Sequence, residues 1–361
     1  MNASAICKHC NINISPTPHA QTLWCHGCGR IITVCRYQET WKQGKVVFET
    51  KFYKHSLRQR FSEDNCQKSL ITSTVKHMHS ETISSWEAPR GKRALLCGVV
   101  YSKQKYRLKG TFNDVNNMRH MLVEHFKFPS SSIHILTGGP YFHPTKRNIQ
   151  AGLKWLVKDC KAGDSLVFYF SGHGLRQPDF DNDELDGFDE TICPLDFKTA
   201  GVILDNEIND TIVRPLKPGV RLHAIVDSCH SGTILDLSYV YNLKDFHSKT
   251  WMNNHPPSNA YKGTSGGQAI CFSACEDDQL AEDTSAFSGK QMSGAMTYTF
   301  IKAILENPDI TYEGIMISMR TAIRQARATG CLLKRLFRRN ILQEPLLSAS
   351  EKFDTNATFN L

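Results

Sequence analysis

Five short, nearly unbroken apolar runs, separated by segments of helical spacing, constrain the fold of this chain most. The runs cover residues 94–101, 132–136, 165–170, 222–226 and 269–274. Apolar residues recur at helical spacing in segments 115–126, 144–160, 206–213, 295–305 and 313–326. Strands that are apolar on both sides and alternate with helices are typical of a parallel sheet covered on both faces. The sequence therefore predicts an α/β fold with a mostly parallel sheet flanked by helices.

The first 91 residues differ in composition from the rest. Residues 1–36 are dense in cysteine, and residues 37–91 are polar without a sustained period. Residues 1–92 carry a net charge of +7, out of +8 for the whole chain. A basic segment can attract nucleic acid or an acidic protein, but a solvated linker is its commoner meaning. We therefore predict a small head, a linker and a folded domain, and we do not expect nucleic acid as a partner.

The sequence shows neither a membrane-spanning segment nor a secretory signal, which limits where we expect the protein. None of the apolar runs is long enough to cross a bilayer, and the first residues lack the pattern of a secretory signal. We expect a cytoplasmic, and in part nuclear, protein without a membrane partner. Its 13 cysteines then fit reduced thiols, metal ligands and one nucleophile better than a disulfide framework.

Two cysteine pairs in the head have the spacing of a zinc site. Cys7 and Cys10 form the first pair, and Cys25 and Cys28 form the second after a 14-residue gap. Four thiolates bind Zn²⁺ tetrahedrally and leave no open position for a substrate, so this zinc would be structural. Free surface thiols are the alternative.

Two of the predicted strands run into turns that hold a base and a nucleophile. Residues 165–170 lead to His173 and Gly174, and residues 222–226 lead to Cys229. Neighbouring parallel strands end at one edge, about 4.8 Å apart, where such sheets bind ligands. Catalysis by a cysteine needs a base that accepts the thiol proton and donors that stabilise an oxyanion. The backbone amides of Gly174 and Cys229 are suited to act as these donors. An inert cysteine and a structural histidine are the alternatives, but the matched positions favour a cysteine hydrolase. The other strand cysteines lack such a partner and are expected in the core: Cys97, Cys271 and Cys275.

Together these motifs resemble the plant type I metacaspases, which are caspase-fold cysteine endopeptidases. The resemblance covers about residues 92–353 and rests on segments 169–174, 183–190, 227–232, 271–275 and 343–345. The short stretch 233–267 in place of the type II insertion, and the cysteine head, indicate type I. The head resembles the zinc finger of plant lesion-simulating-disease proteins. The resemblance implies a large-subunit region at 92–245, an inter-subunit loop at 246–267 and a small-subunit region at 268–361.

Substrate preference depends on acidic residues near the predicted nucleophile. Asp227 lies two residues before Cys229, and strand alternation places both on one face. A carboxylate beside a cleft needs a cationic partner or solvent, which a substrate Arg or Lys would supply. The resemblance implies that Asp114, Ser171 and Asp227 form this pocket, although Asp114 could instead cap a helix. A preference for Asp or Asn is the rival, against which Asp227 counts.

An acidic segment indicates a second cation. Residues 179–190 hold seven carboxylates, which suit either a solvated loop or the oxygen ligands of Ca²⁺. The resemblance implies an activating calcium site at Asp189, Asp205, Asn206 and Asp236. The family usually has aspartate where Asn206 stands, so we expect weak calcium affinity.

The sequence thus predicts an endopeptidase that cleaves proteins after Arg or Lys. The resemblance implies activation by calcium and self-cleavage in the inter-subunit loop, near Lys244, Lys249 or Lys262, with a role in programmed cell death or stress. Regulatory proteins are candidate partners of the head. The alternative function is a catalytically silent adaptor, against which the presence of both His173 and Cys229 counts.

Overall fold

The computed structural model divides the chain into two compact units. One comprises residues 1–80 with 287–291, and the other residues 81–286 with 292–361. Side chains are described for residues 83, 86–102, 104, 106–138, 142–180, 184–229, 231–243, 250–255, 258, 261–274, 294–325 and 344–361. The backbone alone is described for residues 283–284, 293, 326–328 and several short strands before residue 48.

The described residues of the first unit form three antiparallel strand pairs. They are β1 (Ala5–Ile6) with β2 (Asn13–Ile14), β3 (Thr22–Trp24) with β4 (Ile31–Thr33), and β5 (Thr40–Lys42) with β6 (Lys45–Val47). The third pair falls in the predicted linker. The predicted zinc ligands Cys7, Cys10, Cys25 and Cys28 lie outside the described residues.

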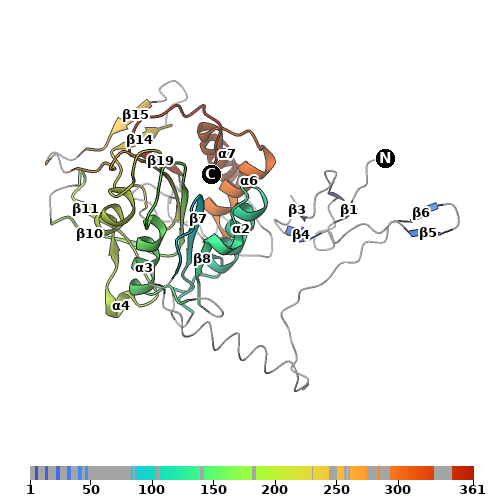
Figure 1. Ribbon diagram of the computed structural model, residues 1–361, viewed down its shortest axis with the longest axis horizontal. Coiled ribbons are helices and arrows are strands. Elements are labelled where there is room, and N and C mark those ends of the chain that lie inside the picture. Colours follow the sequence, from blue (N-terminus) through green and yellow to red (C-terminus); the bar gives the residue numbers. More distant parts are fainter. Residues whose placement is uncertain are drawn as a thin grey trace, which may run out of the picture. The chain divides into compact units, whose positions relative to one another are not determined.

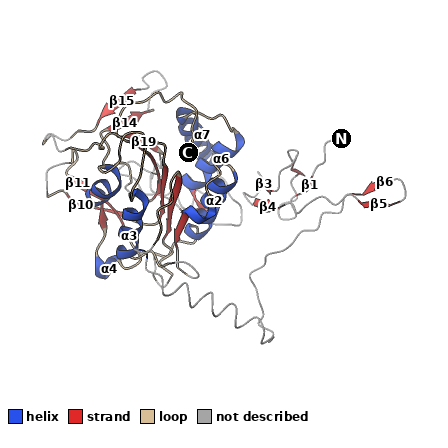
Figure 2. Cartoon of the chain, viewed as in Figure 1, coloured by secondary structure: helices blue, strands red, loops and turns tan. Residues whose placement is uncertain are grey.

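The second unit is built on an eight-stranded sheet, ordered β15-β14-β19-β16-β13-β9-β7-β8 (Figures 1 and 2). Five strands are mutually parallel: β7 (Lys92–Gly98), β8 (Ile133–Leu136), β9 (Ser165–Ser171), β13 (Arg221–Asp227) and β16 (Gln268–Ser273). Three further strands extend one edge through antiparallel pairs: β14 (Tyr239–Asn242), β15 (Thr250–Asn253) and β19 (Leu346–Ala349). The five parallel strands match the five predicted runs to within three residues at each end.

Helices cover both faces of this sheet, as Figure 1 shows. One face carries α2 (Thr111–Glu124), α6 (Ala295–Glu306) and α7 (Tyr312–Ala328). The other carries α3 (Lys146–Val157), with α5 (Asp205–Ile208) continuing into the π-helical turn η3 (Asn209–Val213). The predicted fold class is confirmed. Among the described residues, no helix is long and apolar enough to span a bilayer.

Alternation along the strands divides the core between the two helical layers. Leu95, Phe168 and Ala224 belong to the cluster that packs under α3 and α5, whereas the intervening residues face α2, α6 and α7. On that second face Phe272 contacts Phe300 and Phe359 edge-on. Because both faces are apolar, the central strands have no solvent side, which explains their unbroken hydrophobic sequence.

The segment before the first parallel strand also joins this core. Trp86 is buried, stacks on His134 at 3.6 Å and contacts Trp155 edge-on. Trp155 in turn donates through its indole N–H to the carbonyl oxygen of Glu87 at 2.6 Å. The sequence interpretation assigned residues 83–91 to a linker. They instead include side chains that pack against the hydrophobic core under α3.

A small antiparallel sheet follows β9 directly. Its strands are β10 (Gly174–Pro178), β11 (Phe188–Ile192) and β12 (Ile203–Leu204), and the short helix α4 (Phe197–Ala200) lies between the last two. The sequence interpretation described this region only as an acidic loop. Its strands are short and mixed in polarity, so they carry no clear alternation.

Candidate active site

The two strands expected to present the catalytic pair are neighbours. β9 and β13 are parallel, and Ser171 at the end of β9 lies in register with Asp227 at the end of β13. The amide of Gly172 donates to the carbonyl oxygen of Asp227 at 3.3 Å. His173 and Cys229, each two residues beyond those partners, therefore leave the sheet side by side at its carboxyl edge, as the sequence predicted.

Gly174 allows the two turns to approach closely. A Cβ added there would overlap the carbonyl oxygen of Cys229 and would lie 3.0 Å from the carbonyl oxygen of Thr191. Only glycine lets the chain after His173 pass directly against the Cys229 backbone. This contact holds the histidine turn and the cysteine turn together.

The imidazole of His173 is half-buried and held in one tautomer. Its Nε2 lies 2.6 Å from the carbonyl oxygen of Tyr106, and because a carbonyl oxygen only accepts, Nε2 must carry the proton. The other ring nitrogen, Nδ1, is then the atom that can accept one. A neutral histidine held in this way is suited to act as a general base.

Tyr101 supports His173 from behind. Its hydroxyl accepts a hydrogen bond from the amide of His173 at 3.0 Å and donates to the carbonyl oxygen of Cys193 at 2.5 Å. Its ring packs against the imidazole with the centroids 4.7 Å apart. Burial, with smaller contributions from Cys193 and Cys229, raises the pKa of Tyr101 well above its ordinary value. The hydroxyl therefore stays protonated and keeps both hydrogen bonds.

Replacing Tyr101 by phenylalanine is expected to lower kcat about tenfold with little change in KM. Phenylalanine keeps the ring contact but loses both hydrogen bonds, each of which contributes about 1 kcal/mol. The matched control is Tyr106→Phe, because Tyr106 holds His173 through its backbone carbonyl and not through its hydroxyl. Steady-state kinetics on both variants check this, and equal kcat for Tyr101→Phe and the parent would contradict the positioning role.

Cys229 differs from the other described strand cysteines in exposure. It is partly exposed, whereas Cys97 and Cys271 are fully buried, as predicted for core thiols. Burial raises the pKa of Cys271 to about 12, and burial followed by the neighbouring Cys229 raises that of Cys193 to about 12. At neutral pH these buried thiols are protonated and poor nucleophiles. Cys275 lies outside the described residues.

The three residues predicted to bind a basic side chain lie together. The hydroxyl of Ser171 donates to Asp114 Oδ2 at 3.3 Å, and the amide of Gly294 donates to the same oxygen at 3.0 Å. Asp227 Oδ2 accepts from the amide and the hydroxyl of Thr297 at 2.8 and 2.6 Å. Both carboxylates are buried, with 1% and 5% of Asp114 and Asp227 exposed. These donors are hydroxyl and amide groups, which stabilise the two carboxylates.

Two details of the sequence interpretation are wrong here. Asp114 does not cap α2, because the helix begins at Thr111 after Gly110 without a side-chain cap and Asp114 lies within the first turn. Strand alternation does not relate Asp227 to Cys229, because β13 ends at Asp227. Asp227 instead accepts hydrogen bonds from the first turn of α6, where helix amide groups favour negative charge.

The four residues predicted to bind calcium gather in a second acidic cluster. Gln177 donates to Asp189 at 3.3 Å, and Asp205 accepts from the amides of Glu190 and Asn206 at 2.7 and 2.8 Å. Burial, followed by the charge of Asp236, raises the pKa of Asp205, and Asp189 adds a smaller effect in the same direction. These three carboxylates are buried, and Asn206 is half-buried. Among the described residues, however, no three His, Cys, Asp or Glu side chains form a ready-made metal site.

A lysine and a glutamate that were not predicted as ligands complete this cluster. The Lys262 ammonium contacts Asp236 and lies 2.7 Å from Glu184 Oε1. Burial alone would lower the pKa of Lys262, but Asp236 and Glu184 raise it overall, and burial raises the pKa of Glu184. We refer to Glu184, Asp189, Asp205 and Asp236 as the acidic cluster.

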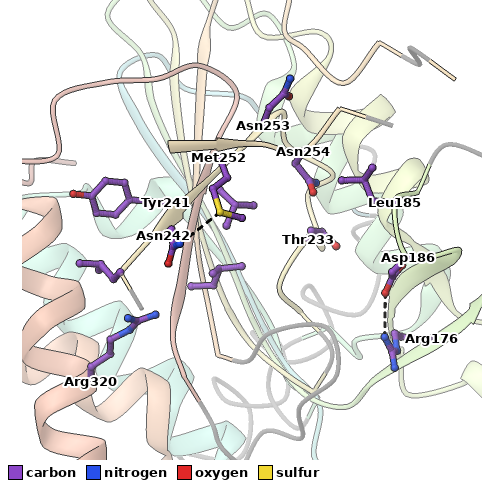
Figure 3. A pocket seen from close by; sticks show the side chains of 13 residues that line it. Arg176, Leu185, Asp186, Thr233, Tyr241, Asn242, Met252, Asn253, Asn254 and Arg320 are labelled. Atoms are coloured by element: carbon purple, nitrogen blue, oxygen red, sulfur yellow. Dashed lines mark hydrogen bonds and ion pairs between the residues drawn. The ribbon is translucent and has the colours of Figure 1, made fainter. Parts of the chain in front are cut away.

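A cavity of about 420 Å³ lies farther along the sheet, beside the segment that follows Cys229 (Figure 3). Thr233 and Arg176 line one side, and Asn242 and Met252 of the β14–β15 pair line the other. Arg176 pairs with Asp186 at 3.2 Å at its rim. His173 and Cys229 are not among its lining residues, so this cavity is separate from the candidate site.

Comparison with known proteins agrees with this arrangement. The sequence profile described as "Metacaspase, peptidase C14 domain" matches residues 92–238. Metacaspase-1 of Arabidopsis thaliana is 47% identical over 287 residues, which cover 74% of this chain and 78% of that protein. Metacaspase-3 of the same plant is 47% identical over 271 residues, with 74% of each chain covered. The chain belongs to the metacaspase family. Its membership makes it a cysteine endopeptidase.

Among solved structures, caspase-1 from Spodoptera frugiperda aligns with a TM-score of 0.43 and 7% identity, over 73% of this metacaspase and 88% of that chain. The fold assignment rests on the sheet topology and on the family membership, and not on this alignment.

Sequence reasoning missed several residues around the site of this metacaspase. Tyr101 follows β7 as His173 follows β9, and Gly98 at the end of β7 lies in register with Ser171. The rule that functional residues follow the carboxyl ends of parallel strands, which we call the strand-end rule, would therefore have found Tyr101 if it had been applied to every such strand. Thr297 and Gly294 carried no such signal, because they act through the tertiary contact between α6 and β13.

Proposed function

We propose that this metacaspase cleaves peptide bonds after Arg or Lys, with Cys229 as nucleophile and His173 as general base and acid. Support comes from the tautomer of His173, which presents Nδ1 as acceptor. His173 takes the proton of the Cys229 thiol, and the thiolate attacks the scissile carbonyl carbon. The amides of Gly174 and Cys229 stabilise the oxyanion. The imidazolium then protonates the leaving amine, and water hydrolyses the thioester.

The preference for a basic residue is supported by the buried carboxylates of Asp114 and Asp227. A guanidinium or ammonium group is the partner that two desolvated carboxylates favour. An acidic residue would instead place a further negative charge beside them. The same preference makes self-cleavage after a lysine of the inter-subunit loop feasible. Lys244 and Lys249 lie outside the described residues, and Lys262 is buried.

Activation by calcium is supported by where the acidic cluster lies in the chain. Glu184 and Asp189 belong to the segment that follows His173, and Asp236 belongs to the segment that follows Cys229. Thr233 also donates to Glu190 at 2.5 Å and joins the same two segments. Ca²⁺ binds oxygen ligands of this kind, and when bound it would neutralise the cluster and fix both segments.

The remaining parts of the proposal rest on the cysteine spacing and on the family. Cys7, Cys10, Cys25 and Cys28 would hold a structural Zn²⁺ in a head that binds regulatory proteins. The protein would act in the cytoplasm, and also in the nucleus, during programmed cell death or stress.

One assay tests substrate preference and calcium together. Fluorogenic peptides ending in Arg, Lys, Asp or Asn are incubated with the full chain, in calcium or in chelator. We expect turnover of the Arg and Lys peptides alone, falling at least about tenfold in chelator because the acidic cluster loses its divalent ion. Activity unaffected by chelator would contradict calcium activation, and cleavage of Asp peptides alone would contradict the basic preference. No cleavage under any condition would favour the silent adaptor.

A further inference from the structure

The acidic cluster already holds a cation that belongs to the chain. Lys262 is 1% exposed, among the most buried charged residues of the described chain, and its ammonium contacts both Asp236 and Glu184. Glu184 and Asp236 side chains are each 5% exposed. Burying an ammonium group costs several kcal/mol unless carboxylates surround it. The contacts with Asp236 and Glu184 therefore explain why Lys262 is buried.

The charges around this lysine favour an ion of higher valence. Asp205 is electrostatically coupled to Asp236, to Asp189 and to Glu184. Glu184 and Asp236 both contact the Lys262 ammonium, and Asp205 interacts electrostatically with each of them. Ca²⁺ carries two charges and takes six to eight oxygen ligands, several of which carboxylates supply. It would therefore neutralise the cluster more fully than Lys262 does.

Lys262 lies in a loop and not in a strand of the sheet. The lysine lies between β15 and β16, and the preceding Tyr261 is 62% exposed. The carbonyl oxygen of Lys262 accepts from the hydroxyl of Ser238 at 3.3 Å, and Lys262 is not part of any strand of the sheet. Release of the Lys262 side chain would therefore not require strands of the sheet to separate.

We infer that Lys262 is a tethered cation that occupies the calcium site in the metal-free protein, and that Ca²⁺ binds by displacing it, with Glu184 joining the ligands. This inference rests on the proposed calcium activation. Binding then exposes Lys262 and the loop that carries it, and the exchange lowers the apparent calcium affinity.

The test measures calcium binding and not peptidase activity. Full-length protein carrying Cys229→Ala, which prevents self-cleavage, is titrated with CaCl₂ by calorimetry, with and without Lys262→Met. Methionine retains the length of the side chain without its charge. We expect the Kd for calcium to fall at least about tenfold in Lys262→Met, because the competitor is removed. The matched control Lys302→Met removes a surface ammonium that pairs with Glu306 on α6 and should leave the Kd unchanged.

Equal or weaker calcium binding by Lys262→Met would overturn the exchange and leave calcium activation intact. No binding by either protein at millimolar calcium would overturn both the exchange and calcium activation. The assignment of Cys229 and His173 as the catalytic pair does not depend on either result, because peptide turnover is measured separately.

A second measurement keeps the lysine and so does not depend on the variant folding. Limited trypsin digestion of the Cys229→Ala protein should cleave after Lys262 several times faster in calcium than in chelator, because trypsin needs the side chain exposed. Cleavage after Lys352, which is exposed and lies outside the helices and strands, serves as the internal control and should not change. Equal cleavage after Lys262 in both conditions would contradict the displacement.

Discussion

Replacing Cys229 by alanine is expected to abolish peptide hydrolysis, with kcat/KM falling more than about a thousandfold. Loss of a catalytic nucleophile removes the covalent route, and what remains is the small contribution of substrate positioning and oxyanion donors. The substitution removes one sulfur atom from a partly exposed side chain at a turn, so the fold should be unaffected. Steady-state kinetics with an Arg peptide, together with a thermal unfolding curve, measure both effects.

The matched control is Cys271→Ala. Cys271 lies on the neighbouring strand β16 but is fully buried, and burial raises the pKa of its thiol to about 12. Its removal leaves a small cavity that costs about 1 kcal/mol of stability and should leave activity in place. If Cys271→Ala lost activity and Cys229→Ala retained it, the nucleophile would have been assigned to the wrong strand.

Replacing Asp227 by asparagine is expected to lower kcat/KM for Arg peptides at least about thirtyfold. Truncating one member of a buried charge pair commonly costs about 2–5 kcal/mol of binding, and the substrate cation would lose half of its carboxylate pair. Asparagine keeps an oxygen that can accept from the amide and hydroxyl of Thr297, so α6 keeps its cap. Alanine would lose that cap as well, at about 1 kcal/mol, and would mix a stability effect with the specificity effect.

Asp164→Asn is the control for this substitution. Asp164 is also buried and accepts from the amides of Gly91 and Lys161 at 2.8 and 3.0 Å, while pairing with Arg93. It lies at the opposite end of β9 from the site. This variant should lose stability without losing activity per folded molecule. Undiminished turnover of Arg peptides by Asp227→Asn would remove Asp227 from the account of specificity.

The parallel part of the fold was predictable because each strand is buried on both faces. Burial requires runs such as residues 94–98 and 222–226 to be apolar throughout, and the helices between them show a period that strands lack. Strand β14 and the edge strand β15 were missed because they are short and only partly buried. β19 was missed because its sequence, Leu-Leu-Ser-Ala, has no alternation to distinguish it from a loop.

The residues of the site also divide into those that the sequence identifies and those that it does not. His173, Cys229 and Asp227 each follow an apolar strand, so the strand-end rule identifies them from the sequence. Asp114 and Thr297 reach the carboxyl edge from helices α2 and α6, and their partners Ser171 and Asp227 lie 57 and 70 residues away in the chain. Lys262 was considered only as a cleavage point, because nothing in its local sequence indicates burial. Contacts between residues distant in the chain leave no local pattern.

Covalent labelling by a peptidyl chloromethyl ketone that ends in Arg tests most directly whether Cys229 and His173 act together on a basic substrate. The attacking sulfur displaces chloride and forms a thioether, which peptide mapping by mass spectrometry locates among the cysteines. We predict that the label lies on Cys229 and that His173→Ala slows its formation. A label on any other cysteine, or a rate that His173→Ala leaves unchanged, would contradict the account.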